Sequence, residues 1–276
     1  MPRRVIQACC AVALATLLGC ATAPNAAPIA QDLSVPVAIR LHTLGRPDVL
    51  VLGEQHDAPD HQDQHRATIG ALAALGELGA VVIEMADAGH HTLGLAAHAT
   101  PAQVQQALAW RDSAWPWAQY GPAVMAAVAA RVPVYGGNLP RQRNAQVMKE
   151  PAWDTRVAPD VLAHQRQAVS QGHCDLLPLA QVGTMTRIQL ARDLELAQTV
   201  QTALAPGKTV LLLTGSQHAH RRWGVPAHLP GHLRVKTVRL AANGPHPDDD
   251  AGFDAVWITP PIPPRYHCAE LRGPAT

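Results

Sequence analysis

The amino-acid sequence predicts an α/β protein with three layers: a mostly parallel sheet covered by helices, with an inserted, mainly helical subdomain. Short apolar runs rich in valine, leucine and isoleucine recur along the chain, which is typical of the buried strands of a parallel sheet. Helical patterns separate several of these runs. From about residue 90 to 205 the chain holds one strand candidate among several helices. This segment, about 90–205, is therefore the predicted insertion.

The predicted strands are the apolar runs at residues 49–53, 80–84, 132–137, 209–215, 233–240 and 254–259. After the first run, Ile69 and Leu72 lie at helical spacing. Another helix begins at Thr100, because threonine can cap it, proline follows, and a glutamine three residues later completes a capping box. The last helix of the insertion, roughly 179–205, ends before a Pro-Gly pair.

The N-terminus has the pattern of an export signal. Arg3 and Arg4 precede a short apolar run that ends at Gly19-Cys20, too short for a membrane span of about 20 residues. This ending resembles the bacterial lipobox, so we expect a lipoprotein signal peptide over 1–19 and lipidation of Cys20. The alternative is an ordinary cleaved signal.

Residues 20–40 are the predicted lipidated tether and 41–276 the folded domain. We expect an exported protein, lipid-anchored and facing the periplasm, with the outer membrane as its location.

The net charge indicates which partners to expect, and the cysteines indicate the compartment. Lys plus Arg number 22 and Asp plus Glu 21, a formal net charge of +1, so nothing predicts a nucleic-acid partner, which normally requires a basic patch. Beyond the signal and Cys20, Cys174 and Cys268 remain. An even pair in an exported protein predicts a disulfide; two buried free thiols are the alternative.

Four of the predicted strands end in a polar signature. In chain order, these four signatures contain Glu54 and His56, Glu84, Asn138, and His218. Ligands of open α/β sheets bind beyond the carboxyl ends of the strands, and Glu and His serve as acid–base groups or metal ligands. Glu54, His56, Glu84 and His218 are therefore candidate catalytic or metal-binding residues. In the alternative interpretation, Glu84 and Asn138 cap the helices that follow and the histidines are exposed loop residues.

His61 and His65 stand four residues apart and share one face of a predicted helix, where they could chelate a metal. Chance pairs are expected, however, among 15 histidines. We therefore expect His65 on the helix surface, whereas His61, nearer the strand end, could reach the site.

Aromatic residues are scarce, at 4% of the sequence, yet four of them fall within residues 110–120, "WRDSAWPWAQY". Such a cluster suits an apolar, planar ligand or the core of a small helical unit. By composition alone, core packing is the favoured interpretation.

With these residues in view, the sequence resembles the ChaN-like family of bacterial haem-binding lipoproteins, which are grouped with the Tiki and erythromycin-esterase proteins. The matching motifs spread over most of the chain after Cys20: "LGEQHDAPDHQDQ", "VVIEM", "WPWAQYGPAVMAA", "YGGNLPR", "GHCDLLP", "RIQLARDLELAQ", "LLTGSQHAHRRWGVPAHL" and "YHCAEL". The first and the seventh are the most specific.

The resemblance implies an α/β core with a helical insertion, a lipid anchor and haem binding linked to iron uptake. It implies Tyr120 or a nearby histidine as the axial haem ligand, since both side chains suit iron. It also implies that Gln189, Arg192 and Asp193 brace the site. A homodimer is a possible state.

The relatives contain a second functional class. The Tiki proteins use two Gly-x-x-His motifs and a glutamate for metal-dependent peptidase chemistry; here the matching positions are 53–56, 215–218 and Glu84. A metal-dependent hydrolase or peptidase, with a divalent metal, is therefore the alternative to haem binding, which we place first.

Overall fold

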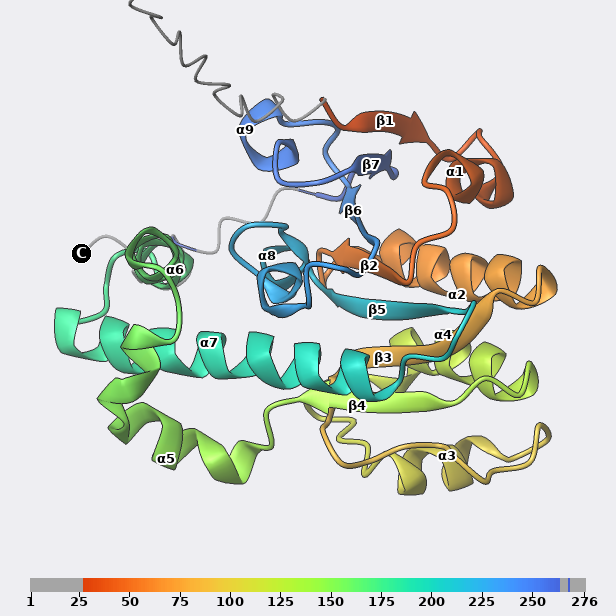
Figure 1. Cartoon of the computed structure of the whole chain (residues 1–276), viewed down its shortest axis with the longest axis horizontal. Helices are drawn as coiled ribbons and strands as arrows, with labels where there is room; N and C mark the ends of the chain where they lie inside the picture. Colours follow the sequence, from red (N-terminus) through yellow and green to blue (C-terminus); the bar gives the residue numbers. More distant parts are fainter. Residues whose placement is uncertain (1–26, 264–267, 269–276) are drawn as a thin grey trace, which may run out of the picture.

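The computed structural model describes residues 27–263 and residue 268. In this part of the chain one parallel sheet has the strand order β1-β7-β6-β2-β5-β3-β4 (Figure 1). The strands are β1 (Ile29–Asp32), β2 (Val49–Glu54), β3 (Leu78–Asp87), β4 (Val134–Asn138), β5 (Thr209–Gly215), β6 (Val235–Ala241) and β7 (Ala255–Ile258). The α/β class and its six strands are confirmed, and β1 is a seventh.

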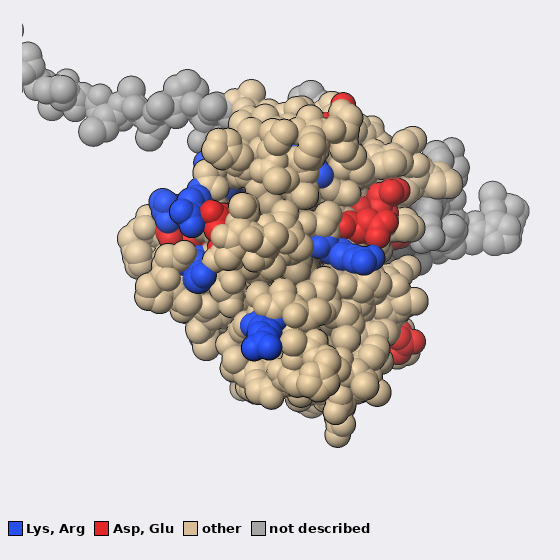
Figure 2. Space-filling model, turned by 90° about the vertical axis from the view of Figure 1, so that its right-hand side faces the viewer, with Lys and Arg blue, Asp and Glu red and all other residues tan. Residues whose placement is uncertain are grey.

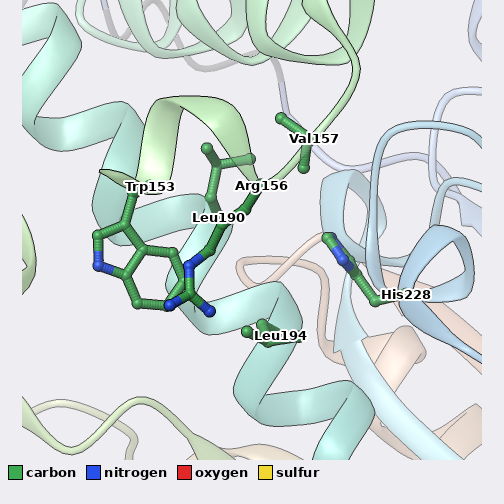
Figure 3. A pocket seen from close by; sticks show the side chains of 6 residues that line it. All are labelled: Trp153, Arg156, Val157, Leu190, Leu194 and His228. Carbon is green, nitrogen blue, oxygen red and sulfur yellow. The ribbon is translucent and has the colours of Figure 1, made fainter. Parts of the chain in front are cut away.

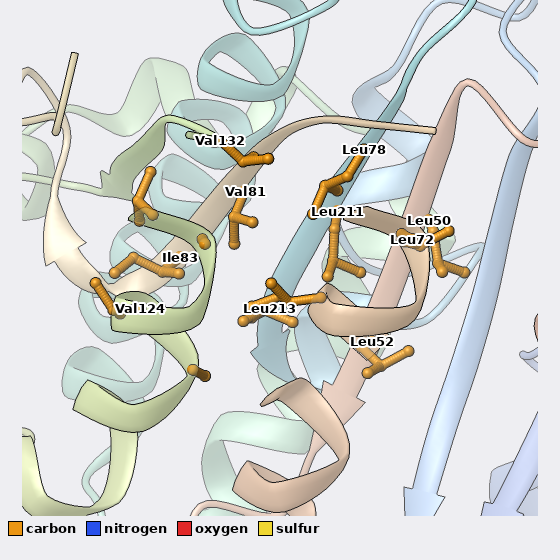
Figure 4. Close-up of a cluster of buried hydrophobic side chains, with 14 of the residues drawn as sticks. Leu50, Leu52, Leu72, Leu78, Val81, Ile83, Val124, Val132, Leu211 and Leu213 are labelled. Atoms are coloured by element: carbon orange, nitrogen blue, oxygen red, sulfur yellow. The ribbon is translucent and has the colours of Figure 1, made fainter. Parts of the chain in front are cut away.

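Helices bury both faces of the sheet. Leu50 and Leu52 of β2 pack into one core with α2 (Pro59–Ala74) and α4 (Trp117–Ala129), and part of this core is drawn in Figure 4. Their neighbours in the strand point to the other face and pack with α7 (Leu179–Thr202) and α8 (Ser216–Ala219). Successive strand residues face opposite sides, so burial on both faces produces the unbroken apolar runs seen in the sequence.

The segment 90–205 supplies most of the helical cover. It contains α3 (Pro101–Ala107), α4, β4, α5 (Asn144–Lys149), α6 (Pro159–Gly172) and α7, together with the 3₁₀ turns at Arg141–Arg143 and Pro151–Thr155. Thr100 forms the expected capping box at the start of α3. Within this segment β4 joins the sheet as one of its two edge strands. The second half of α7 covers the sheet, while its first half lies with α5 and α6 beyond the strand ends (Figure 1).

The tether prediction was wrong at its C-terminal boundary, because the folded domain begins before residue 41. β1 pairs with β7, and α1 (Val37–Thr43) docks through Arg40. The Arg40 guanidinium lies 4.2 Å from the centre of the Trp257 ring, and its Nη2 donates to Gln64 Oε1 at 2.7 Å. The sequence hides this because β1 is a short edge strand with little burial, so it lacks the apolar pattern of the other strands.

The expected signal peptide and Cys20 lie outside the described residues. None of the helices within 27–263 is long and apolar enough to cross a membrane. On the face drawn in Figure 2, lysine and arginine form small separate groups, several of them beside acidic residues. The two small helices not yet named are α9 (Pro247–Asp250) and the 3₁₀ turn Val225–His228.

Cys174 and Cys268 form the predicted disulfide, with a Cα–Cα distance of 5.4 Å. The bridge joins the end of the α6 region to a position 94 residues later in the chain. It therefore closes a long loop, and cross-linking a long loop reduces the entropy of the unfolded chain.

We expect Cys174→Ser to lower the free energy of unfolding by about 2–4 kcal/mol, because the variant loses this restriction of the unfolded state. Urea denaturation of oxidised protein measures the change. As a control, wild type and variant should have similar stability in reducing buffer. Detection of two free thiols in oxidised wild-type protein by mass spectrometry would contradict the prediction.

Candidate functional site

Glu54, His56, Glu84 and His218 lie together at the carboxyl edge of the sheet, as the strand ends predicted. Glu54 ends β2, Glu84 belongs to β3, and His218 follows β5, which runs between those two strands. His56 Nδ1 lies 2.5 Å from Glu54 Oε1, and His218 Nε2 lies 3.7 Å from Glu84 Oε1. Their convergence follows from the parallel direction of the three neighbouring strands.

The Glu54 carboxylate is buried and has polar partners from three directions. Oε1 accepts hydrogen bonds from His56 Nδ1 and, at 2.8 Å, from the Tyr120 hydroxyl of α4. Oε2 accepts from Gln62 Nε2 of α2 at 2.8 Å, and His65 Nε2 lies 3.4 Å away. Burial opposes the charge of Glu54, but the His65 and His56 rings and the Tyr120 hydroxyl outweigh it, so the pKa of Glu54 is lowered. This carboxylate therefore ties β2 to α2 and α4 as an ionised group.

His56 is held by one ring nitrogen and leaves the other available. Because an ionised carboxylate only accepts, the Nδ1 of His56 carries the proton donated to Glu54. The side chain is 41% exposed, and its ring meets Trp115 edge-on with 4.9 Å between centroids. Nε2 lies over Gly215, where a Cβ would approach it to 3.0 Å. Any larger residue at position 215 would therefore crowd Nε2.

His218 repeats the same arrangement in a more enclosed place. Its Nδ1 donates to Asp193 Oδ1 of α7 at 2.6 Å, and its Nε2 faces Glu84. Glu84 Oε2 in turn accepts from the Gly215 N–H at 2.8 Å and from the Thr214 hydroxyl at 2.7 Å. Both imidazoles are therefore oriented through Nδ1 by a buried carboxylate, which leaves Nε2 as the functional nitrogen.

The charges of this cluster stabilise one another. Burial by itself lowers the pKa of His218, but the charges of Asp193 and Glu84 reverse this and raise it to about 9. Burial raises the pKa of Glu84, yet the His218 and His56 rings, the Gly215 N–H and the Thr214 hydroxyl bring it down to about 2. For His56, burial is again outweighed by Glu54 and Glu84, so its pKa is raised. Burial keeps the pKa of Asp193 raised despite the facing His218.

Local sequence explains how the loops after β2 and β5 come so close. A Cβ on Gly53 would lie 2.7 Å from the Ala219 Cβ and 3.0 Å from the Ser216 Cα. Only glycine therefore lets α8 pack against the end of β2. The Ser216 hydroxyl then donates to the Glu54 carbonyl oxygen at 2.9 Å, which joins the two Gly-x-x-His segments.

The surface position expected for His65 was wrong, since both His61 and His65 are fully buried. His61 Nδ1 accepts from the Gln55 N–H at 2.8 Å and Nε2 lies 3.0 Å from Thr259 Oγ1. Burial lowers the pKa of His61 to about 4, so it is a neutral structural residue beside the site. The signal was present in the sequence: both histidines share the helix face of Ile69, which packs on the sheet.

The other predicted residues surround this cluster. Asn138 Nδ2 donates to the Glu84 carbonyl oxygen at 2.9 Å, so it positions the end of β3 rather than capping a helix. Asp193 braces His218, as the helix motif suggested. Gln189 Oε1 and Arg192 Nε are buried and have no hydrogen-bond partner within the described chain. The sequence interpretation missed Gln62, whose only signal is its place beside His61 on the buried face of α2.

Within the described chain, no group of three or more His, Cys, Asp or Glu residues is arranged to hold a metal ion. Glu54 and Asp193 are each already bonded to an imidazole Nδ1. The structure therefore gives no support to the predicted divalent metal on Glu54, His56, Glu84 and His218.

This fold and this site define an α/β protein with paired histidine–carboxylate groups at the carboxyl edge of a parallel sheet. The family described as "Haem-binding uptake, Tiki superfamily, ChaN" matches residues 41–229. The chain belongs to this family of haem-binding uptake proteins. None of the curated proteins matches the sequence.

Among solved structures, the chain is similar to ChaN of Campylobacter jejuni, whose structure is described as showing cofacial haem binding. The TM-score is 0.65 at 23% identity over 79% of this chain and 89% of that chain, which supports the shared fold. Weaker similarities, each at 11% identity, are to the type III effector HopBA1, with a TM-score of 0.47 over 80% of this chain and 92% of that one, and to the erythromycin esterase EreC, with 0.43 over 79% and 77%.

We expect Glu54→Gln to lower the free energy of unfolding by about 2–4 kcal/mol and to lower the pKa of His56. The amide keeps the size of the side chain but presents a donor to neighbours that are themselves donors, and a buried charged network loses its acceptor. Urea denaturation and NMR titration of the imidazole measure the two effects. Glu77→Gln, at a surface ion pair with Arg46, should cost at most about 1 kcal/mol. Equal stability of Glu54→Gln and wild type would contradict the prediction.

Proposed function

We propose that the protein binds haem at the carboxyl edge of the sheet, with His56 Nε2 as the iron ligand, and serves haem uptake from a lipid anchor. The observation that carries the proposal is the state of His56. Its Nδ1 is bonded to Glu54, its side chain is 41% exposed, and its Nε2 lies beside Gly215, where any Cβ would crowd it at 3.0 Å. A carboxylate on the second nitrogen fixes the ring and raises its basicity, as in many metal-bound histidines.

The residues around His56 fit a large planar ligand. Trp115 lies edge-on to the imidazole and beside Tyr120, in the aromatic cluster that the sequence singled out. Gln189 and Arg192 have polar atoms without partners among the described residues. In the proposal the aromatic side chains contact the porphyrin, and Arg192 Nε donates to one of its carboxylates. Haem bound here would supply the iron that the protein carries.

Tyr120 has a different role in this proposal. It is buried, and its hydroxyl donates to Glu54. Burial and the Glu54 charge raise the pKa of Tyr120, which disfavours the phenolate that would bind iron. We therefore assign Tyr120 to the support of Glu54, and through it of His56, and take a nearby histidine as the ligand.

The hydrolase alternative takes second place. His56, His218 and Glu84 could orient a water molecule, but Glu84 is buried and held by Gly215 and Thr214. The described residues offer no grouping for a metal ion. Family membership supports haem instead.

We expect His56→Ala to weaken haem binding by about tenfold or more. Removing only the hydrogen-bond partner of a metal ligand typically lowers metal affinity about 10–100-fold, and removing the ligand itself should cost at least as much. The intensity and position of the Soret band during haem titration measure this. His42→Ala changes an exposed histidine of α1 and should bind haem like wild type. Tyr120→Phe should keep the Soret position of wild type. A Soret band unchanged in His56→Ala would refute the ligand assignment.

A second variant tests the same ligand without removing it. Gly215→Ala places a Cβ about 3 Å from His56 Nε2 and should weaken haem binding while the imidazole remains. Gly183→Ala adds the same methyl group in α7 where no atom lies within 4 Å, and it should bind haem normally. Equal affinity in both glycine variants would contradict the proposed position of the iron.

The lipid anchor belongs to the same proposal, on the basis of the Leu-Leu-Gly-Cys sequence that ends at Cys20. Its acyl chains would hold the domain at the periplasmic face of the outer membrane, where haem enters.

We expect Cys20→Ser to move the protein from the membrane fraction to the soluble fraction, because no acyl chain can then be attached. Immunoblots of separated membranes measure the distribution, and Cys174→Ser should leave it unchanged. Equal membrane association of wild type and Cys20→Ser would contradict the anchor.

A further inference from the structure

A cavity of about 210 Å³ lies beside α7, and Leu190 and Leu194 of this helix line it (Figure 3). Its walls come from three parts of the chain: the turn containing Trp153 with the residues that follow it, the helix α7, and the turn that ends at His228. The lining residues are Trp153, Arg156, Val157, Leu190, Leu194 and His228. Apart from Arg156 and His228, the walls are hydrocarbon or indole.

The two polar residues of the cavity have unused hydrogen-bonding capacity. The Arg156 guanidinium lies 4.4 Å from the centre of the Trp153 ring and has no carboxylate partner among the described residues. The nearby Asp154 is already bonded by Arg187 through two nitrogens. His228 Nε2 is buried and lacks a hydrogen-bond partner within the same described part. In Figure 3 Arg156 and His228 flank the cavity from opposite sides.

A buried polar atom without a partner costs free energy, and an indole wall beside a free guanidinium combines apolar contact with positive charge. A ligand that contacts the indole wall and pairs with the guanidinium must have a flat or compact apolar body and an anionic group. A carboxylate fits best, since arginine binds it through two parallel hydrogen bonds and a ring nitrogen of His228 can supply a further donor.

We propose that this cavity binds a small carboxylic acid with a single-ring aromatic or similarly compact apolar body. The carboxylate lies between Arg156 and His228, and the apolar body contacts Trp153, Leu190 and Leu194. The cavity is smaller than the roughly 300–1,000 Å³ of drug-sized sites, so a porphyrin does not fit it. His56 is not among the residues that line this cavity, although Leu194 directly follows the Asp193 that braces His218.

Calorimetric titration of the purified, haem-free protein with phenylacetate tests the proposal. We expect one site with a Kd at or below about 1 mM, the scale for a ligand of this size. Phenylacetamide, the uncharged isostere, should bind at least about tenfold more weakly, since it cannot form the charge-assisted pair. Absence of binding at about 10 mM phenylacetate, or equal binding of the acid and the amide, would overturn the proposal.

Three variants locate the binding. Arg156→Gln removes the charge and Leu194→Phe fills the cavity, and each should weaken phenylacetate binding about tenfold or more. Arg66→Gln is the matched control, because Arg66 is an exposed arginine of α2, on the other face of the sheet; it should bind like wild type. An undiminished affinity in Leu194→Phe would refute the location.

A haem titration separates this inference from the proposed function. Saturating haem should leave phenylacetate binding in place, and Leu194→Phe should keep the wild-type Soret response. If haem displaces phenylacetate and Leu194→Phe also loses the Soret response, the cavity is part of the haem site and the inference of a separate site is wrong. A loss of haem binding in His56→Ala with normal phenylacetate binding would support both assignments.

Discussion

Burial of the sheet on both faces is the constraint on which the other features of this protein depend. Every residue of strands β2 and β5 is buried. In these two strands the ionisable side chains are confined to the strand end, where they find polar partners. Because all the strands run parallel, the carboxyl ends of β2, β5 and β3 bring their polar residues to one place. The site is therefore a direct consequence of a parallel sheet that is buried on both faces.

The charged side chains at this edge of the sheet are largely buried, and buried charges must be paired because an unpaired one is costly. Glu54 and Asp193 are buried carboxylates, and each orients one imidazole through Nδ1. Such pairs contribute little net stability, because desolvation offsets their attraction. Their value here is orientation: each carboxylate fixes one imidazole ring through Nδ1, and His218 Nε2 then faces Glu84. The two histidines differ mainly in exposure, since His56 borders solvent and Trp115 while His218 is enclosed under α7. For this reason we propose His56, and not His218, as the iron ligand.

The long helix α7 connects three parts of the molecule. Its second half covers the sheet through Leu196 and Val200. Its middle supplies Asp193 to the site. Its first half packs with α5 and α6. Leu190 and Leu194, on either side of Asp193 in the sequence, form one wall of the cavity beside Trp153. A single rigid element therefore bears on both the proposed haem site and the proposed acid site, and a ligand at either one contacts the same helix.

The sequence by itself determined the strands, the covering helices and the convergence of four site residues, because these depend on short-range patterns: apolar runs, helix caps and the residue that ends each strand. Tertiary structure decided what those residues do. The hydrogen bond that the Tyr120 hydroxyl donates to Glu54 and the docking of Arg40 over Trp257 join positions far apart in the chain. No local sequence pattern encodes such contacts, because the residues next to a tyrosine in the sequence do not show whether its side chain faces solvent or a buried carboxylate. Only the packing of α2 and α4 on the sheet determines which one it meets.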